Sequence, residues 1–142
     1  MADAADLEPF KASKTGKAKE IKKISYSLSL DHGTDINLYL TTEKDYEPSV
    51  AVSDKNGNVV DFELEKISGR YRLVIPQMAA HQLGKLYTVS VDEGVMVMNI
   101  SALSYAYSTL SYTGSDAQKL FVSALYEYYT AAVAYQNAQQ MS

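Results

Sequence analysis

A two-residue hydrophobic period, running from residue 24 to about residue 101, is the feature that most constrains the fold of this chain. In the segment ISYSLSL, Ile24, Tyr26 and Leu28 alternate with serines, so one face is apolar and the other carries hydroxyl groups. Successive side chains of a β-strand point to opposite faces, and this alternation is typical of a strand with one buried face. The pattern therefore predicts sheet in this part of the chain.

The same alternation returns six more times, with Gly, Pro or Asn between the segments. The predicted strands span residues 24–30, 34–42, 48–54, 58–66, 70–76, 85–92 and 95–101. The Asn56-Gly57 pair favours a two-residue hairpin turn, and Pro76 is expected to end its strand because proline cannot donate to a sheet ladder. About seven short strands at intervals of roughly ten residues predict a mainly β protein, with an immunoglobulin-like β-sandwich over residues 24–101.

After residue 101 the apolar residues recur every three or four positions, which is the helical period. Residues 102–112 and about 117–138 are predicted to be helices. Ser101 is the expected cap of the first helix, and Ser115 or Asp116 that of the second. Together they form a C-terminal helical hairpin, residues 102–142, that packs on the sandwich.

The second predicted helix carries two apolar stripes. The first stripe is expected to lie on the sandwich, which places Tyr128 and Tyr135 in the core; it comprises Ala117, Phe121, Ala124, Leu125, Tyr128, Ala131, Ala132 and Tyr135. The second stripe comprises Val122, Tyr126, Tyr129 and Val133. Two interpretations of it stand side by side. Either it meets Tyr105 and Tyr112 of the first helix along the hairpin seam, or these four tyrosines form an exposed band that docks a partner.

Charge is distributed unevenly along the chain. Six of the 13 Lys and Arg residues lie in residues 11–23, and the remainder of the chain is acidic, which argues against a nucleic-acid surface on the folded part. Residues 1–23 are expected to be a flexible Lys-rich linker, because small and polar residues accompany the lysines. No segment approaches the roughly 18 apolar residues of a membrane span, so membrane insertion is not expected.

Few residues in this chain suit catalysis. It has no cysteine, which removes disulfides, thiolate metal sites and cysteine nucleophiles. His32, in the sequence LDHGTD, and His81 both lie in predicted turns, where structural roles are favoured over a metal site. A run resembling a calcium loop begins at Asp54 but lacks the glycine required at its sixth position. We therefore expect no enzyme activity, no catalytic residues, no metal and no cofactor.

Tyrosines are the best candidates for a binding site, since the chain has 12 Tyr and no Trp. Tyr39 is predicted on the outer face of its strand and Tyr46 in a loop. With the helical tyrosines, they complete the set of predicted ligand or partner contacts: Tyr39, Tyr46, Tyr105, Tyr112, Tyr126 and Tyr129. Exposed aromatic rings also stack on sugars, so carbohydrate binding is the alternative to protein docking.

Three segments in combination resemble an uncharacterised module of large secreted or wall-attached proteins from clostridial, Gram-positive anaerobes, including gut species. They are SYSLSLDHGTDINLYL, SGRYRLVIPQMAAHQLGKLYTVSV and the helical pair SALSYAYSTL and DAQKLFVSALYEYYTAAVAY, and the likeness covers about residues 24–136. The resemblance implies an extracellular or cell-surface location within a longer chain. It also implies a non-catalytic accessory role, as a spacer or a protein-docking module. The implied partners are neighbouring domains of the same polypeptide or another surface protein, with polysaccharide as the alternative.

Overall fold

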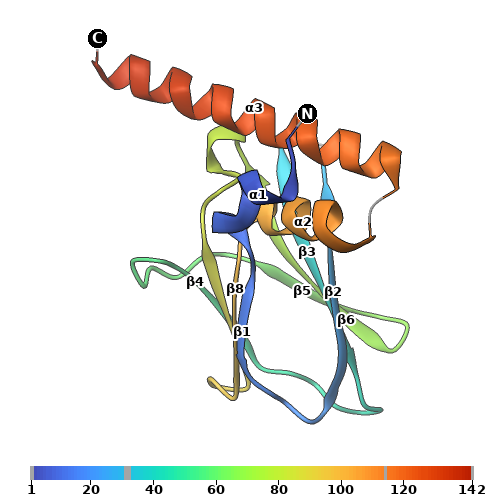
Figure 1. Cartoon of the computed structure of the whole chain (residues 1–142). Coiled ribbons are helices and arrows are strands. Elements are labelled where there is room, and N and C mark those ends of the chain that lie inside the picture. Colours follow the sequence, from blue (N-terminus) through green and yellow to red (C-terminus); the bar gives the residue numbers. More distant parts are fainter. Residues whose placement is uncertain (1, 31–32, 114, 142) are drawn as a thin grey trace.

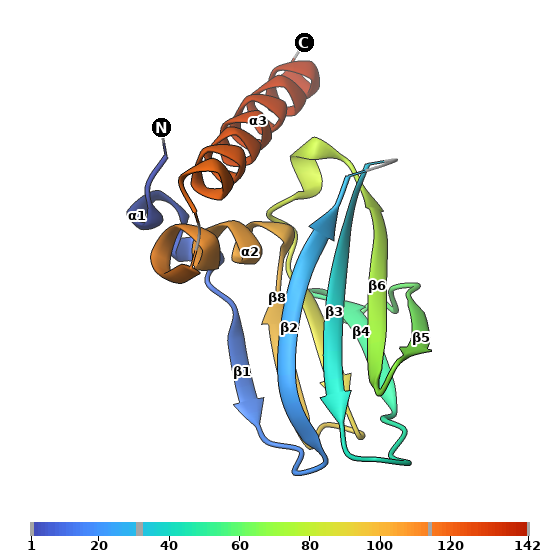
Figure 2. The same ribbon diagram turned by 90° about the vertical axis from the view of Figure 1, so that its right-hand side faces the viewer.

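The computed structural model describes residues 2–30, 33–113 and 115–141, and it is mainly β, with two antiparallel sheets of four strands and a C-terminal helix (Figure 1). The two sheets face each other, and the helices lie together across one end of them (Figure 2). The elements are α1 (Ala4–Leu7), η1 (Glu8–Phe10), β1 (Ser13–Gly16), β2 (Ile21–Ser29), β3 (Thr34–Thr42), β4 (Val50–Asp54), β5 (Glu63–Ile67), β6 (Arg70–Met78), η2 (Ala80–Gln82), β7 (Tyr87–Val91), β8 (Met96–Ile100), α2 (Ala102–Ser108), the π-helical turn η3 (Thr109–Thr113) and α3 (Asp116–Met141).

The strand order is β1-β8-β7-β4 in one sheet and β2-β3-β6-β5 in the other. Each of the seven predicted segments overlaps one of the strands β2 to β8. On five of these strands the side chains at every second position are buried in the core, except that Val50 on β4, which was expected to point inward with Val52, is half-buried. The buried ones are Ile36, Leu38, Leu40, Val52, Tyr71, Leu73, Ile75, Tyr87, Val89, Val91, Met96, Met98 and Ile100. Removal of this apolar surface from water is the main force that holds the two sheets together.

The eighth strand, β1, lies in the segment that we expected to be a flexible linker. It pairs antiparallel with β8, beginning with Ser13 opposite Asn99. At its end, Gly16 has a φ of +79°, and a Cβ atom there would lie 2.2 Å from the carbonyl oxygen of Val95. Only glycine fits such a position, because it tolerates positive φ and has no side chain. The lysine-rich composition conceals a short edge strand.

The residues before β1 are also fixed to the body of the protein. Leu7 is completely buried. The hydroxyl group of Ser104 on α2 donates a hydrogen bond of 2.6 Å to the carbonyl oxygen of Phe10, and the backbone N–H of Ala2 donates one of 2.6 Å to the hydroxyl oxygen of Ser123 on α3. The linker prediction for residues 1–23 is therefore wrong over residues 2–16. It failed because two apolar side chains, Leu7 and Phe10, are too few to give a periodic pattern.

A turn forms here, but its central residues are Lys55 and Asn56, because the N–H of Gly57 donates to the carbonyl oxygen of Asp54 at 3.0 Å. Gly57 follows these residues with a φ of +83°, and the two-residue hairpin that we expected is not closed. Only an isolated bridge joins Ser53 to Val59, while β4 pairs with β7 and β5 pairs with β6. The chain thus crosses from one sheet to the other after this turn. Alternation identifies strands, but it does not identify their neighbours.

Strand β6 does not end at Pro76 but continues to Met78. Its register with β3 shifts by one residue, since Ile36 lies opposite Ile75 and Thr34 lies opposite Met78. A bulge of this kind leaves one residue outside the ladder, which removes the need for a proline N–H.

The predicted helix caps are present. The hydroxyl oxygen of Ser101 accepts a hydrogen bond of 3.2 Å from the backbone N–H of Ser104 at the start of α2. Ser115 accepts an equivalent bond of 3.2 Å from the N–H of Gln118 at the start of α3. These caps satisfy N–H groups that have no partner within the first helical turn.

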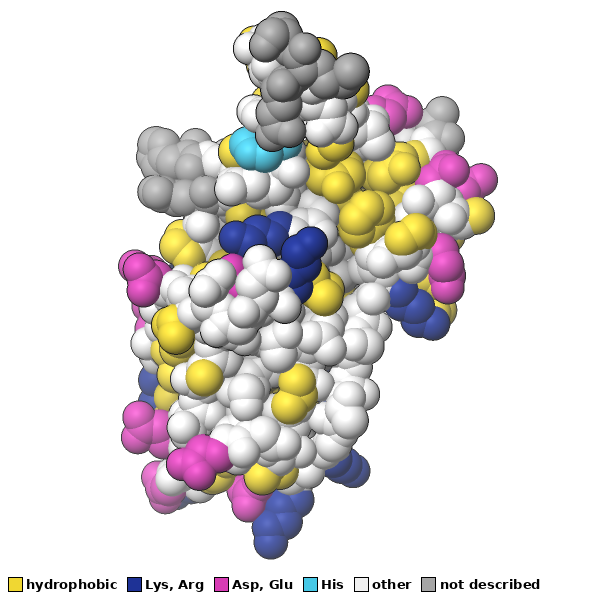
Figure 3. Space-filling model, turned by 90° about the vertical axis from the view of Figure 1, so that its left-hand side faces the viewer, with side chains coloured by type: hydrophobic (Ala, Val, Ile, Leu, Met, Phe, Trp, Pro, Cys, Tyr) yellow, Lys and Arg dark blue, Asp and Glu magenta, His cyan; other side chains and the backbone are white. Residues whose placement is uncertain are grey.

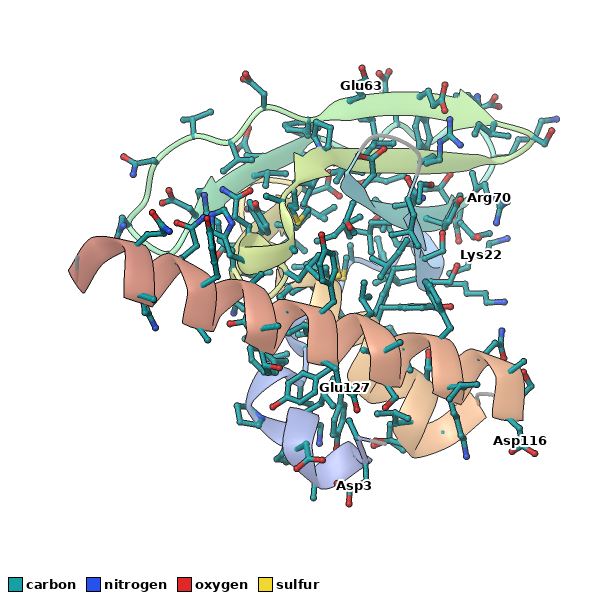
Figure 4. All side chains as sticks on the ribbon, turned by 90° about the horizontal axis from the view of Figure 1, so that it is seen from above. Asp3, Lys22, Glu63, Arg70, Asp116 and Glu127 are labelled. Atoms are coloured by element: carbon teal, nitrogen blue, oxygen red, sulfur yellow. The ribbon has the colours of Figure 1, made fainter. Side chains whose placement is uncertain are left out.

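The orientation of α3 is the reverse of our expectation. Tyr128 and Tyr135, which we predicted to be core residues, are each 64% exposed, whereas Val122 of the second stripe is completely buried. Leu125 is the one large side chain of the first stripe that is buried as predicted. Helix α3 lies across η2 and α2, with α1 near Asp3 on one side and β5 near Glu63 beyond the other (Figure 4). The two stripes are similarly apolar in sequence. The N-terminal segment, which the pattern did not reveal, supplies a surface that fits the second stripe.

Candidate interaction surface at the loop end

Three loops meet at the end of the sandwich that lies farthest from α3. They connect β1 to β2, β3 to β4 and β7 to β8, and we call residues 17–20, 43–49 and 92–95 together the loop end. The first and last described residues lie at the opposite, helical end of the molecule (Figure 1). The loop end is therefore at the opposite end of the molecule from the first and last described residues.

Asp92 holds two of these loops together. Its carboxylate accepts a hydrogen bond from the hydroxyl group of Tyr46 and another, of 3.0 Å, from the backbone N–H of Ser49. The backbone N–H of Asp92 donates in turn to the carbonyl oxygen of Ser49, at 2.7 Å. The third loop is joined through the N–H of Glu43, which donates to the carbonyl oxygen of Glu20 at 2.9 Å. These bonds fix the relative positions of the three loops.

The backbone of the loop end is strained at three residues other than glycine. Asp45, Asp92 and Glu93 have φ values of +64°, +52° and +57°, in the left-handed region that most L-residues avoid. Each such residue costs on the order of 1–3 kcal/mol, and such strain is concentrated at ligand-binding and active sites. The hydrogen bonds of Asp92 with Tyr46 and Ser49 offset part of this cost at one of the three residues.

A hollow of about 420 Å³ opens between the β3–β4 loop and the β5–β6 turn. It is lined by Thr42, Glu43, Lys44, Asp45, Tyr46, Lys66 and Gly69. Both carboxylates and ammonium groups border it, with the ring of Tyr46 as the aromatic element. A lining of mixed charge around one ring suits a polypeptide surface better than a small apolar molecule.

A second, smaller hollow of about 190 Å³ lies near the β1–β2 loop and is strongly basic. It is lined by Lys14, Lys17, Ala18, Ile21, Lys22, Lys23, Ile24 and Met96. The two other loops carry Glu43, Asp45, Glu47, Asp92 and Glu93, so the loop end has a basic side and an acidic side. Acidic and basic side chains gather at this end of the molecule in Figure 3.

Tyr39 lies on the outer face of its sheet, as predicted. It is opposite Ser25 on β2 and Arg72 on β6. The guanidinium carbon of Arg70 lies 4.4 Å from the centre of its ring, which is close enough for a cation–π interaction. One face of the ring is therefore occupied within the protein itself.

Tyr126 and Tyr129 are residues of α3 whose side chains pack against the N-terminal segment and are partly buried. The ring centre of Phe10 is 6.4 Å from that of Tyr126 and 5.7 Å from that of Tyr129, both in edge-to-face geometry. These residues do lie in a seam, but their ring partner is the N-terminal segment rather than Tyr105 and Tyr112. The prediction that Tyr126 and Tyr129 meet Tyr105 and Tyr112 along the helical hairpin is therefore wrong, since Phe10 takes that place.

The other two helical tyrosines are separate from this pair. Tyr105 packs against Tyr26 with ring centres 6.4 Å apart, and Tyr112, which is 70% exposed, lies 6.4 Å from Tyr107. The four helical tyrosines therefore do not form one exposed band. Of the six tyrosines predicted as contacts, only Tyr46 belongs to the loop end.

The remaining polar candidates have structural surroundings. The carboxylate of Asp54 accepts hydrogen bonds from the N–H groups of Asn56 and Asn58, at 2.9 and 3.0 Å, and the bond from Asn58 lowers its pKa below the ordinary value. His81 borders an open groove of about 470 Å³ with Lys55 and Tyr129. His32 lies outside the described residues. Within residues 2–30, 33–113 and 115–141, no three His, Asp or Glu side chains are grouped to hold a metal ion.

Sequence reasoning missed Asp92, the residue that joins the loops. The tight turn at Glu93-Gly94 indicated only that a loop was present, since the partners of Asp92 lie more than 40 residues away in the chain.

None of the helices in the described part of the chain combines the length and the apolar character needed to cross a bilayer. No known family model, curated protein or solved structure matches this chain.

Proposed function

We propose that this chain is a non-catalytic interaction module that docks a partner protein through its loop end. The observation that carries the proposal is the pair of hydrogen bonds that the Asp92 carboxylate accepts from Tyr46 and Ser49. These bonds hold two loops with strained backbone in fixed positions at the end of the sandwich away from both termini. Loops held rigidly at the end of a β-scaffold are a common way to build a binding surface. Rigid loops also bind with a smaller loss of conformational entropy.

The proposed fold type is an immunoglobulin-like sandwich. When β2 to β8 take the letters A to G, one sheet has the order A-B-E-D and the other contains C-F-G. This is the order of a constant-type immunoglobulin domain. Strand β1 then adds to the free edge of strand G, and the helices are additions at one end. The strand order supports this assignment.

The proposed setting is a longer extracellular protein of the bacterial cell surface, and it rests on the resemblance to the clostridial module. Neighbouring domains of such a protein would attach at the helical end, because both ends of the described chain lie there (Figure 1). The loop end would then project outward toward another surface protein. This arrangement favours docking over a simple spacer role.

Carbohydrate binding is the second candidate, and one surface favours it. The outer face of the β1-β8-β7-β4 sheet bears hydroxyl and amide groups without charge: Ser13, Thr15, Ser53, Thr88, Ser90 and Asn99. Thr88 donates to the Oδ1 atom of Asn99 at 2.7 Å, and the Nδ2 atom of Asn99 donates to Ser13 at 3.2 Å. Figure 3 shows this broad face with few charged side chains. Neutral hydrogen-bonding groups on a flat face suit a polysaccharide chain.

The two candidates are separated by binding of the fluorescently labelled protein to intact cells of gut anaerobes and to mucin-coated beads. Docking to a protein predicts that binding is lost after the cells are treated with protease and is retained after periodate oxidation of glycans. It also predicts that Asp92→Ala abolishes binding and that Thr88→Ala, on the uncharged face, leaves binding intact. The reverse pattern would establish the carbohydrate alternative, and absence of binding to both targets would leave the spacer role.

A further inference from the structure

Helix α3 carries an exposed apolar stripe, in which Tyr128 also borders a hollow of about 450 Å³ beside Met78 and Leu83. Its members are all exposed and repeat in steps of three and four residues: Ala117, Phe121, Ala124, Tyr128, Ala131, Tyr135 and Ala138. We call this set the outer stripe. In heptad terms the aromatic residues occupy every a position and the alanines every d position. A strict seven-residue repeat on one helix face is the pattern of a helix that pairs with another helix.

The outer stripe also has few charged residues beside it on α3. The charged residues of α3 are Asp116, Lys119 and Glu127, and no charged residue follows Glu127. The C-terminal part of α3 extends beyond the sandwich (Figure 1), yet it bears Tyr135, whose side chain is 64% exposed. An exposed helix face that is aromatic and uncharged is typical of a surface that binds a protein.

We infer that the outer stripe binds a second copy of this chain, with the two α3 helices antiparallel. In an antiparallel pair, a positions of one helix pack in layers with d positions of the other. Each Phe or Tyr ring of this stripe then lies against an alanine of the partner copy. A parallel pair would place ring against ring and alanine against alanine, which produces crowding and gaps in alternate layers. The alternation of large and small residues is thus complementary to itself only in the antiparallel sense.

Two antiparallel registers give six such layers. In the first, the two-fold axis passes near Tyr126, so that Tyr128 of each copy lies opposite Ala124 of the other. In the second, the axis passes between residues 129 and 130, and Tyr128 lies opposite Ala131. Both registers place exposed residues of one copy against exposed residues of the other, since every member of the outer stripe is exposed.

The available area is sufficient for a dimer. Phe121, Tyr128 and Tyr135 are 44%, 64% and 64% exposed. With about 200 Å² per aromatic side chain, their exposed surface is roughly 350 Å² in each copy. Including the four alanines and the neighbouring Leu120, which is 62% exposed, two copies bury on the order of 1,200 Å², the lower bound for stable, specific interfaces. Self-association is therefore expected to be weak and dependent on concentration.

Sedimentation velocity with the whole chain, from about 5 to 500 µM, tests this inference, since interfaces of this size give affinities around the micromolar range. The wild-type protein is expected to shift from monomer to dimer across the series. Ala131→Glu places a charge within the apolar seam and is expected to raise the dissociation constant at least about tenfold. Asn137→Glu adds the same charge on an exposed position of the same helix, away from the outer stripe, and is expected to leave the dissociation constant unchanged.

Both positions are exposed, so circular dichroism is expected to show that both variants fold like the wild type. A wild-type protein that stays monomeric throughout the series overturns the inference. So does a dimer that Ala131→Glu and Asn137→Glu affect equally. The loop end takes no part in this contact, so failure here leaves the proposed function standing, and failure of loop-end docking leaves the helix pair standing.

The antiparallel sense has its own test. The chain has no cysteine, so a single Asn137→Cys variant carries one spin label per copy. With a rise of 1.5 Å per residue, the two labels lie about 33 Å apart along the axis in the first register and about 23 Å apart in the second. A parallel pair would place them roughly 10 Å apart, the usual distance between packed helices. A distance near 10 Å therefore contradicts the antiparallel arrangement.

Discussion

Replacement of Leu7 by alanine tests whether the N-terminal segment is part of the folded body. A linker residue contributes nothing to stability, whereas the structure buries the Leu7 side chain completely among the helices at one end of the sandwich. Truncation to alanine removes three carbon atoms from this site. The expected result is a large loss in the free energy of unfolding.

The size of the loss follows from the burial. At about 0.8 kcal/mol per buried methylene, the removed atoms account for roughly 2.4 kcal/mol of transfer free energy. A residual cavity adds to this at about 24 cal/mol per Å³, which gives a total of about 3–4 kcal/mol, within the range for buried Leu→Ala changes. Domains of this size have a free energy of unfolding of about 5–15 kcal/mol, so the variant should fold but be much weaker.

Urea unfolding followed by circular dichroism measures this loss. With a slope of about 2 kcal/mol per M, the midpoint is expected to fall by roughly 1.5–2 M. Val59→Ala is the matched control, because Val59 is 88% exposed and its truncation should change stability by less than about 0.5 kcal/mol. If Leu7→Ala shifts the midpoint no more than Val59→Ala does, then the N-terminal segment is not docked and the account of the helical end is wrong.

Three further predictions concern single residues. Ser104→Ala removes the bond to the Phe10 carbonyl and the bond accepted from the N–H of Ser101, and is expected to cost about 1–3 kcal/mol in urea unfolding, whereas the exposed Ser115→Ala should cost about 1 kcal/mol. Gly84→Ala places a Cβ atom 2.6 Å from the Tyr129 hydroxyl oxygen and should cost about 1–3 kcal/mol, with a smaller loss in a Tyr129→Phe background. Because hydrogen bonds from Asn58 lower the pKa of Asp54 below 3.8, the folded state favours its carboxylate. The stability that Asp54 contributes is present above pH 3.8 and is lost as the pH falls through its folded pKa, so the difference between wild type and Asp54→Asn should shrink on acidification; a constant difference would refute this assignment.

The sheets were largely predictable from sequence because their signal is local. Ile36, Leu38 and Leu40 alternate with polar residues, and burial follows directly from that alternation. The pairing of the strands was harder to predict from the sequence, as the segment around Asn56 and Gly57 shows. The Asn-Gly pair indicated that a turn lies here, but the choice of β7 rather than β5 as the neighbour of β4 is a tertiary property.

At the helical end, the sequence predicted the helices and their caps but not the residues against which they pack. The caps at Ser101 and Ser115 follow from local sequence, while the inward face of α3 depends on Phe10 and Leu7, which are distant in the chain and isolated among polar residues. Two stripes of equal apolar character gave no basis for choosing between them. Most of the stripe that we assigned to the core, including Tyr128 and Tyr135, is exposed in the structure, and only Leu125 of its large side chains is buried.

The loop end shows the same limit of local signals. Tyr46 was a candidate because it is a tyrosine in a loop, but its partner Asp92 became visible only when the fold brought the two loops together. A hydrogen bond between residues 46 positions apart leaves no periodic trace in the sequence.

Hydroxyl-radical footprinting of the tyrosines, read by mass spectrometry at a low and a high protein concentration, tests most directly which face of α3 is free and what covers it. At low concentration, Tyr128 and Tyr135 are expected to oxidise much faster than Tyr126 and Tyr129. At high concentration, Tyr128 and Tyr135 are expected to become protected, while Tyr112, which lies outside the outer stripe, keeps its rate. Fast oxidation of Tyr126 and Tyr129 in the dilute sample, or unchanged rates at Tyr128 and Tyr135 in the concentrated one, would contradict the account.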